Sequence, residues 1–198
     1  ALVPWSLDYF AHIFQKPADK PCVALIFEGG QATGKSSVHL MVSSVLGNHL
    51  SRIMDKSLKQ WNGALANSLM LVYDEFNVNM YSDKEYYNFL KDLITSPRVS
   101  IKEKYVSGIE LDSYHRLVFT TNDAQAIKLP NDDRRFVIIR TTNHWHDNLE
   151  HFQELKELLK SDSARAGFKH WLMSRQLTHN VSIAPMTQAK EELLHTQS

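Results

Sequence analysis

The chain has 198 residues, of which 43% are hydrophobic, so it can bury one substantial core and is most simply a single α/β domain. Its 22 basic and 22 acidic residues exclude a generally basic surface, so any contact with nucleic acid must rely on a local basic cluster. A single cysteine excludes an internal disulfide framework, and no apolar run approaches the roughly 20 residues of a membrane span. We expect a soluble, cytoplasmic chain without membrane contact, in the host cytoplasm if it is viral, and a piece of a longer protein because it begins at Ala1.

The first predicted element is a short helix from Ser6 to Phe14, with Ser6 as its N-cap and apolar residues at helical spacing. A strand from Val23 to Phe27 follows. After it comes the strongest motif of the chain, which reads Gly29-Gly30-Gln31-Ala32-Thr33-Gly34-Lys35-Ser36 and continues through Ser37 into a helix that ends at Leu46.

This motif fits the G-x-x-x-x-G-K-[ST] phosphate-binding loop, with the expected strand before it and helix after it. Its glycines leave no side chain between the main chain and a ligand, so backbone N–H groups can converge on phosphate oxygens. Lys35 is expected to reach the β- and γ-phosphates, and the Ser36 hydroxyl to coordinate Mg²⁺. The pattern predicts that residues 29–37 bind ATP with Mg²⁺.

A second motif ends a buried strand. A strand from Leu50 to Met54 and a helix from Leu58 to Leu65 are weakly indicated, and then a continuous apolar run, Leu69 to Tyr73, ends in Asp74 and Glu75. This is the Walker B pattern. In an open parallel sheet the acids would lie beside the phosphate loop, where Asp74 would bind Mg²⁺ and Glu75 would act as general base.

The middle of the chain predicts an amphipathic helix from Lys84 to Ile94, followed by a β-hairpin from Val99 to Asp112 with its turn at Ser107-Gly108. The basic residues of this segment are Arg98, Lys102 and Lys104. On its own the segment is equally typical of an ordinary solvated hairpin.

A further buried strand, His115 to Thr121, ends at Asn122, whose amide can contact a γ-phosphate or orient water, or serve turn chemistry alone. Arg134 and Arg135 precede a last strand, Phe136 to Ile139, and could also be surface charge. Helices are predicted for residues 147–159 and 163–177, as core or lid elements. The histidines and acid of residues 143–147 are more typical of structural positions than of a metal site.

Together these motifs resemble the superfamily 3 helicases, in the branch found in phage, plasmid and poxvirus-type primase-helicase proteins. The resemblance covers roughly residues 7–141 and depends on the order and spacing of its marks, which are the phosphate loop, Trp61-Asn62, Tyr73-Asp74-Glu75, Leu90 to Thr95, Ile101 to Lys104, Thr120-Thr121-Asn122 and Asp133-Arg134-Arg135-Phe136.

The resemblance implies an AAA+ ATPase core with a central parallel sheet over residues 21–142, a packed N-terminal helix over 1–20 and a helical segment over 143–198. It also implies a ring, usually a hexamer, with ATP between subunits, and a primase or polymerase domain elsewhere in the full-length chain. The hairpin's Lys102 and Lys104, supported by Arg98, would grip single-stranded DNA or a forked duplex.

The same resemblance assigns further catalytic residues. Asn122 corresponds to the family's polar strand-end residue, and Arg135, or else Arg134, corresponds to the arginine finger that reaches a neighbour's nucleotide. Ala32 departs from the family, because many relatives have glycine there. An alanine is tolerated if this position keeps an ordinary backbone conformation.

Three functions are compatible with these motifs. The leading hypothesis is an ATP-driven translocase that separates DNA strands during replication of a phage or mobile element. A small-molecule kinase uses the same loop but does not require a water-activating Glu75. An ATP-gated replication initiator or loader, assembling on nucleic acid without unwinding it, is the third.

Overall fold

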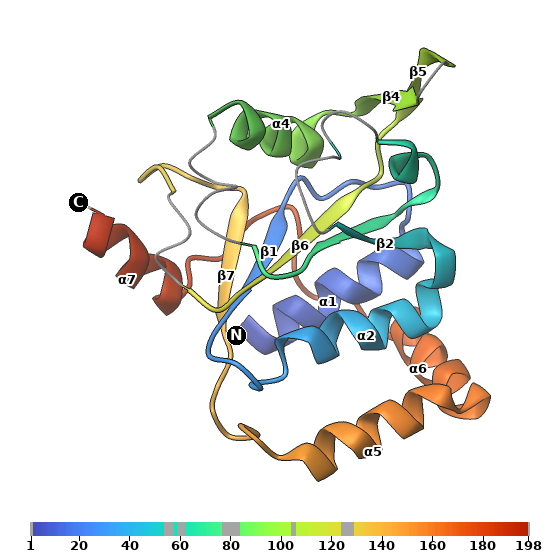
Figure 1. The fold of residues 1–198 in the computed structure, drawn as a ribbon, viewed down its shortest axis with the longest axis vertical. Coiled ribbons are helices and arrows are strands. Elements are labelled where there is room, and N and C mark those ends of the chain that lie inside the picture. The colour runs from blue at the N-terminus through green and yellow to red at the C-terminus, as the bar shows by residue number, and fades with distance from the viewer. Residues whose placement is uncertain are drawn as a thin grey trace.

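A computed structural model describes residues 2–53, 58, 62–76, 84–103, 106–123 and 129–197. Its centre is a sheet of five parallel strands in the order β2-β3-β6-β1-β7 (Figure 1). The strands are β1 (Ala24–Glu28), β2 (Leu50–Ile53), β3 (Met70–Tyr73), β6 (Arg116–Thr121) and β7 (Phe136–Arg140). The predicted α/β class with a central parallel sheet is therefore confirmed.

Helices cover both faces of this sheet (Figure 1). They are α1 (Leu2–Gln15), α2 (Lys35–Leu46), α4 (Lys84–Thr95), α5 (Leu149–Lys160), α6 (Asp162–Ser174) and α7 (Gln188–Gln197), with short 3-10 turns η1 (Gly47–His49) and η3 (Gly63–Asn67). The apolar strand residues alternate between two clusters, as the period of two in a strand requires. In β1, Leu25 and Phe27 pack toward α1, α2 and α6, whereas Ala24 and Ile26 pack on the face that α4 and α7 cover.

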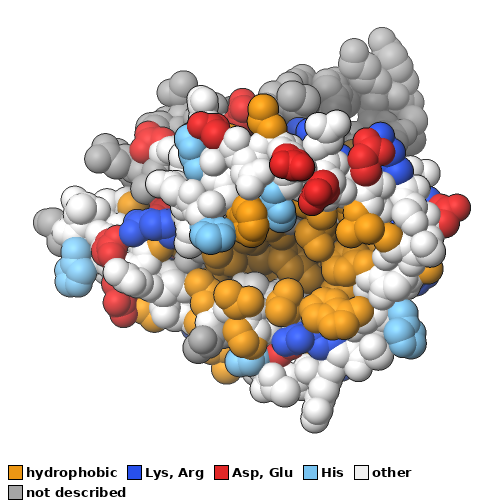
Figure 2. Space-filling view, turned by 90° about the horizontal axis from the view of Figure 1, so that it is seen from below, with side chains coloured by type: hydrophobic (Ala, Val, Ile, Leu, Met, Phe, Trp, Pro, Cys, Tyr) orange, Lys and Arg blue, Asp and Glu red, His pale blue; other side chains and the backbone are white. Residues whose placement is uncertain are grey.

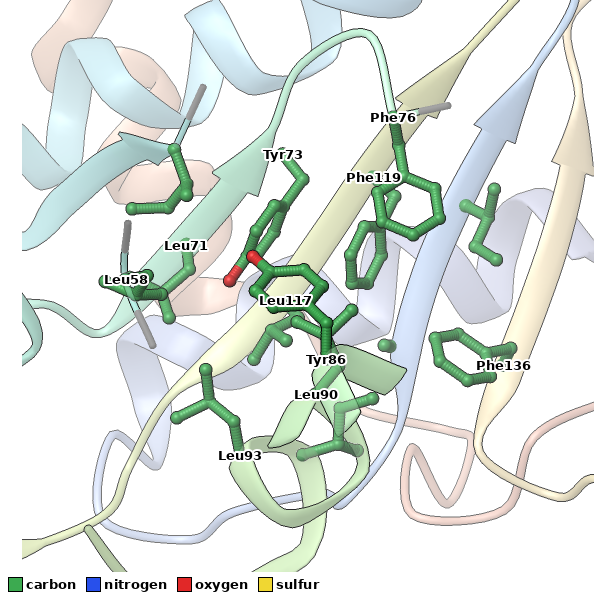
Figure 3. Close-up of a cluster of buried hydrophobic side chains, with 14 of the residues drawn as sticks. Leu58, Leu71, Tyr73, Phe76, Tyr86, Leu90, Leu93, Leu117, Phe119 and Phe136 are labelled. Carbon is green, nitrogen blue, oxygen red and sulfur yellow. The ribbon is translucent and has the colours of Figure 1, made fainter. Parts of the chain in front are cut away.

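The cluster beneath α4 shows how the sheet and helix interlock (Figure 3). Tyr86, Leu90 and Leu93 of α4 point toward the sheet, where Tyr73 and Phe119 stack with their ring centroids 4.9 Å apart. The helix predicted for residues 84–94 is amphipathic because of this contact. The packing of these side chains holds α4 against the sheet. Because β4 follows α4 closely in the chain, this packing also positions the start of the hairpin.

The predicted hairpin is present as β4 (Arg98–Glu103) and β5 (Val106–Asp112), but its predicted turn is wrong. Because Glu103 pairs with Val106, residues 107 and 108 lie inside β5 instead of between the strands. The register changes between Ile101, which pairs with Ile109, and Glu103. A glycine in a strand accommodates such a β-bulge as readily as it accommodates a turn, which explains the error at Gly108.

The N-terminal helix is longer than predicted, and the N-cap assignment is wrong. It begins at Leu2, so Ser6 lies inside it and its hydroxyl donates to the Leu2 carbonyl oxygen at 3.0 Å. Serine competes for backbone hydrogen bonds at both caps and interior turns, so its identity alone does not locate the helix start. The helix weakly indicated for residues 58–65 lies partly outside the described residues, and its described end is the 3-10 turn η3.

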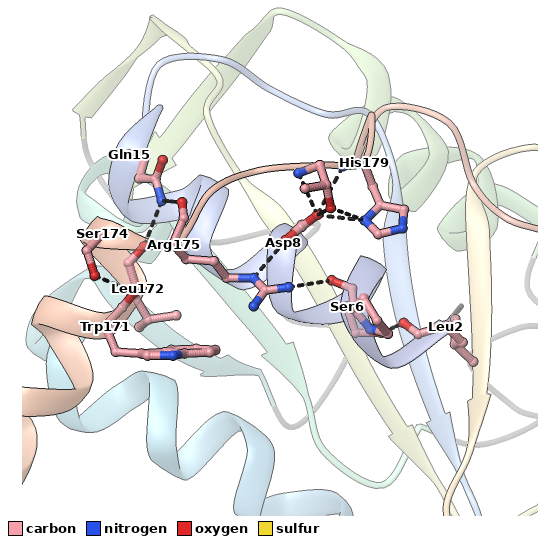
Figure 4. A network of polar contacts seen from close by, with 11 residues as sticks. Leu2, Ser6, Asp8, Gln15, Trp171, Leu172, Ser174, Arg175 and His179 are labelled. Carbon is pink, nitrogen blue, oxygen red and sulfur yellow. Dashed lines mark hydrogen bonds and ion pairs between the residues drawn. The ribbon is translucent and has the colours of Figure 1, made fainter.

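A buried carboxylate joins the N-terminal helix to the segment that follows α6 (Figure 4). Asp8 of α1 is fully buried and accepts hydrogen bonds from Arg175 Nε at 2.7 Å and His179 Nδ1 at 2.7 Å. It also accepts from the Thr178 and His179 backbone N–H groups, both at 3.0 Å. This network ties α1 to the segment that follows α6. Within the described residues, no helix is both long and apolar enough to cross a membrane.

Candidate active site

The predicted phosphate loop follows β1 and leads into the first turn of α2, so its chain wraps around the positive end of that helix. Gly29 and Gly34 have φ angles of 152° and 87°, which favour glycine. A Cβ atom on Gly29 would lie 2.1 Å from Thr141 Oγ1, so this glycine is also required for space. Ala32 has φ 55°, so the condition for tolerating alanine there, an ordinary backbone conformation, is not met, and an alanine in this region costs about 1–2 kcal/mol.

Lys35 is buried beneath the loop. Its ammonium group donates to the Gly29 carbonyl oxygen at 2.8 Å and to that of Gly30. Burial lowers the pKa of the Lys35 ammonium, while the nearby charge of Asp74 opposes this shift. The lysine is thus placed where it binds the loop's own carbonyl oxygens and faces Asp74 at the end of β3, which β6 separates from β1 in the sheet.

The two predicted acids are joined by one hydroxyl group. Thr120 Oγ1, near the end of β6, donates to Asp74 Oδ1 at 2.7 Å and accepts from the Glu75 backbone N–H at 3.0 Å. Glu75 has φ 56°, an uncommon conformation for glutamate, and this hydrogen bond helps to hold it. Thr120 therefore positions both acids.

The second oxygen of Asp74 faces two cationic or titratable groups. Arg52 of β2 forms an ion pair with Asp74 Oδ2, and His39 Nε2 lies 3.8 Å from the same atom. Burial alone would raise the pKa of the Asp74 carboxyl, but hydrogen bonds from Thr120 and Arg52 outweigh it and hold the pKa below its ordinary value. Asp74 is therefore ionised at neutral pH. Among the described residues, neither ring nitrogen of the buried His39 has a hydrogen-bond partner, and burial lowers the pKa of its imidazole.

A cleft of about 470 Å³ brings most of the predicted site together. Its lining comprises residues 31–37 of the loop, both acids and the strand end at residues 120–122, so Asn122 lies where it was predicted. Gly29 and Gly30 lie behind this lining and contribute the carbonyls that Lys35 binds. The opposite wall is formed by Leu40 of α2 and by Leu149, Phe152 and Lys156 of α5.

The structure does not bring the two predicted finger arginines to this cleft. Arg135 precedes β7, and its carbonyl oxygen accepts from the Ala24 N–H at the start of β1, whereas the loop follows the other end of β1. The two ends of β1 are roughly 13 Å apart along the strand. Arg135 also lies 3.6 Å from Asp133, and Arg134 is exposed beside it.

The predicted DNA-binding residues lie elsewhere again, on the hairpin that Figure 1 shows at the far end of the molecule from α5. Arg98 is exposed and its Nε lies 3.6 Å from Glu110 and 4.0 Å from Asp112, so acids of the partner strand compensate its charge. Lys102 is exposed, and Lys104 lies outside the described residues.

A model for a protein family described as a family of unknown function (DUF5906) matches residues 27–135, which is more than half of the chain. The chain belongs to this family. The matched segment begins at the end of β1 and contains the loop, Asp74, Glu75, the hairpin, and the two arginines predicted as fingers.

This DUF5906 chain is similar to proteins of DNA replication. It is 29% identical over 140 residues to a DNA primase-polymerase of Nitratiruptor phage NrS-1, a match that covers 69% of the chain and 19% of that relative. It aligns with a structure of the NrS-1 C-terminal region at a TM-score of 0.84 and 25% identity, covering 98% of the chain and 47% of that structure. The chain thus spans less than half of these relatives.

A structure of JCV helicase aligns over the whole chain and 62% of its own length, with a TM-score of 0.54 and 15% identity. At this identity the likeness shows the fold alone. The five-stranded sheet and its loop thus share the fold of this helicase structure, which agrees with the fold that the sequence resemblance predicted.

Sequence reasoning missed several residues of this DUF5906 site. Thr120 was noted as part of the Thr120-Thr121-Asn122 motif, but no contact with the acids was predicted for it, because threonine is common in strands for packing reasons. Arg52 and His39 gave no signal, because a basic residue in a short strand and a histidine in a helix belong to no local motif. The apolar pattern of α5 was noticed, but it indicated a core helix equally well.

Proposed function

We propose that this chain is the ATP-hydrolysing domain of a superfamily 3 DNA helicase, in the primase-helicase branch found in phages and plasmids. It would act as a homo-hexameric ring that moves along single-stranded DNA during replication of a phage or mobile element. The observation that carries the proposal is the single cleft lined by the phosphate loop, Asp74, Glu75 and Asn122, in a fold shared with helicases.

The donor set of the cleft fits ATP and Mg²⁺. Ser36 and Asp74 both line it, and they offer a hydroxyl and an ionised carboxylate, the oxygen ligands that Mg²⁺ prefers. The loop has no side chain at Gly29 or Gly34 and therefore lets the main chain approach phosphate oxygens closely. Bound Mg²⁺ would neutralise charge that develops on the β- and γ-phosphates.

Each protein group then has a defined task. Lys35 would exchange its loop carbonyls for phosphate oxygens, and Glu75 would accept a proton from the attacking water. Asn122, at the end of the adjacent strand, would orient that water or the γ-phosphate. Thr120 would keep Glu75 in its uncommon backbone conformation throughout.

The position of the arginines supports action between subunits. Arg135, with Arg134 as the other candidate, lies at the opposite edge of the sheet from its own loop, so it would reach the nucleotide of a neighbouring subunit. On the hairpin, Lys102 and Lys104 would contact DNA phosphates. Arg98 is the weaker of the three candidates because Glu110 and Asp112 compensate its charge.

The decisive experiment measures ATP turnover with and without single-stranded DNA, and then unwinding of a forked duplex. Glu75→Gln should keep ATP binding and lose most turnover, whereas Lys35→Ala should lose binding, because it removes the charge that faces the phosphates. Turnover in Glu75→Gln equal to that of the parent would refute the general-base assignment. Turnover without unwinding by an assembled ring would favour an initiator or loader.

A further inference from the structure

The cleft extends past the phosphate loop onto an apolar wall that phosphate groups cannot use. Leu40 of α2 and Leu149 and Phe152 of α5 form this wall, and Leu149 is 78% exposed. Figure 2 views the molecule from the side on which α5 lies in Figure 1, and it shows that hydrophobic side chains are exposed on this face. Exposed apolar side chains that gather in a concave site are typical of a ligand surface.

The wall is not a by-product of core packing. No residue of α5 is buried, although its apolar residues recur at helical spacing, so the core interpretation of this helix is wrong. Leu149, Phe152 and Lys156 share one helix face at i, i+3 and i+7, and this face is turned toward the cleft. The helix therefore presents its apolar face to the space above the loop.

Contact with the loop fixes where this face lies. A Cβ atom on Gly34 would lie 3.1 Å from the Phe152 ring, so the ring rests directly against the loop residue before Lys35. A ligand with its phosphates on the loop must extend either toward the acids or toward α5. The acids take the reacting end, so the remainder of the ligand meets Leu149 and Phe152.

We propose that Leu40, Leu149 and Phe152 hold the base of a nucleoside triphosphate, and that they do so by apolar contact and stacking without reading the edge of the base. This inference rests on the nucleotide function proposed above and extends it to the choice of substrate. Every base has a π-face, so an aromatic and aliphatic wall accepts adenine and guanine alike.

The polar side chains of the wall are consistent with a site that does not distinguish adenine from guanine. Within the described cleft, Lys156 is the one polar side chain that α5 contributes, and it is an ammonium group on a flexible stem. A contact between this group and N7 does not distinguish the purines, because adenine and guanine both present that acceptor. ATP and GTP should therefore bind within about threefold of each other, because no second polar group from α5 opposes either exocyclic substituent.

The proposal is tested by isothermal calorimetry, in which ATP, GTP or inorganic tripolyphosphate is titrated into the 198-residue chain in the presence of Mg²⁺. Leu149→Ser and Phe152→Ala should each weaken ATP and GTP roughly 5- to 30-fold, the loss expected for one apolar side chain. Tripolyphosphate should change less than about twofold in Leu149→Ser. The matched control is Leu158→Ser on the same helix, which is 57% exposed and does not line the cleft.

The outcomes distinguish failure of the proposed base site from failure of the proposed nucleotide-binding function. If ATP binds and neither variant weakens it relative to tripolyphosphate, the base site is refuted while the phosphate site stands. A preference for ATP over GTP beyond about 100-fold would also overturn it, because discrimination of that size needs hydrogen bonds to the base edge. If neither ATP nor tripolyphosphate binds, the nucleotide function itself fails.

Discussion

Replacing Asp8 by Asn tests whether the carboxylate between α1 and the segment after α6 stabilises the fold. The change keeps the size of the side chain but removes its charge and turns one acceptor into a donor. Since Arg175, Thr178 and His179 all direct donors at the buried Asp8, the new amide must face at least one of them without a hydrogen bond.

The expected loss follows from the burial of this group. Removing one partner of a buried ion pair costs about 3–5 kcal/mol, since it leaves an uncompensated charge, here that of Arg175, whose side chain is 20% exposed. In a chain of this length each kcal/mol lowers the melting temperature by about 2–4 °C. Asp8→Asn should therefore melt roughly 6–20 °C below the parent chain.

The pH dependence gives a second, independent signature. Burial alone would raise the pKa of the Asp8 carboxyl, but the hydrogen bonds from His179, Thr178 and Arg175 outweigh it and lower the pKa from 3.8 to about 2. A lowered pKa in the folded state means that this stabilisation is complete above pH 3.8 and is lost as the pH falls through 2. The gap in melting temperature between parent and variant should close over this range.

Thermal denaturation at several pH values decides the matter. Asp162→Asn is the control, because Asp162 pairs with Arg165 on an exposed helix surface and should change stability by at most about 1 kcal/mol. If Asp8→Asn melts with the parent between pH 4 and 7, the network does not stabilise the fold.

Two changes test the positioning of the site and of the hairpin. Thr120→Val removes the hydroxyl that hydrogen-bonds to both Asp74 and Glu75, and should lower turnover or Mg²⁺ affinity about 10- to 100-fold. Thr121→Val is the control, because the Thr121 hydroxyl does not contact either acid, and it should have a smaller effect in the same turnover assay. Asn62 donates from its side chain to the Ser100 carbonyl at 2.8 Å and accepts from the Lys102 N–H at 2.5 Å, so Asn62→Ala should speed amide exchange in β4 and weaken binding of single-stranded DNA. Unchanged exchange at Lys102 would show that β4 does not depend on that side chain.

The elements that sequence predicted well are those whose signals are local. The strands β3 and β6 are buried along their whole length, and their largely apolar sequences were therefore recognisable without the structure. The phosphate loop was equally clear, since Lys35 and Ser36 have no reason to recur at that spacing in an ordinary turn.

The errors arose where one residue type serves two local structures. Ser6 suits a helix cap and a helix interior, and only the observed start of α1 separates these alternatives. Gly108 suits a turn and a bulge, and only the pairing of β4 with β5 separates them. Ala32 shows the converse, because the loop imposes a left-handed conformation on a residue that does not favour it.

Other features of the site depend on contacts between distant segments. Arg52, His39 and Asp74 come from three elements, and their meeting at one carboxylate leaves no trace in any short stretch of sequence. The exposed face of α5 is a property of its position above the loop, not of its composition, since the same apolar spacing would suit a buried helix.

The length of strand β7 sets the distance between Arg135, which precedes it, and Thr141, which follows it and contacts the phosphate loop. The strand pairs with β1 in one register from Phe136 to Arg140, so its start fixes Arg135 at the edge of the sheet. Directly after its end, Thr141 donates to the Glu28 carbonyl oxygen and shares a 2.8 Å hydrogen bond with Thr33 in the loop. The apolar residues of β7 can thus vary in identity, whereas inserting or deleting one residue would reverse their inward and outward faces and uncouple the strand's two ends.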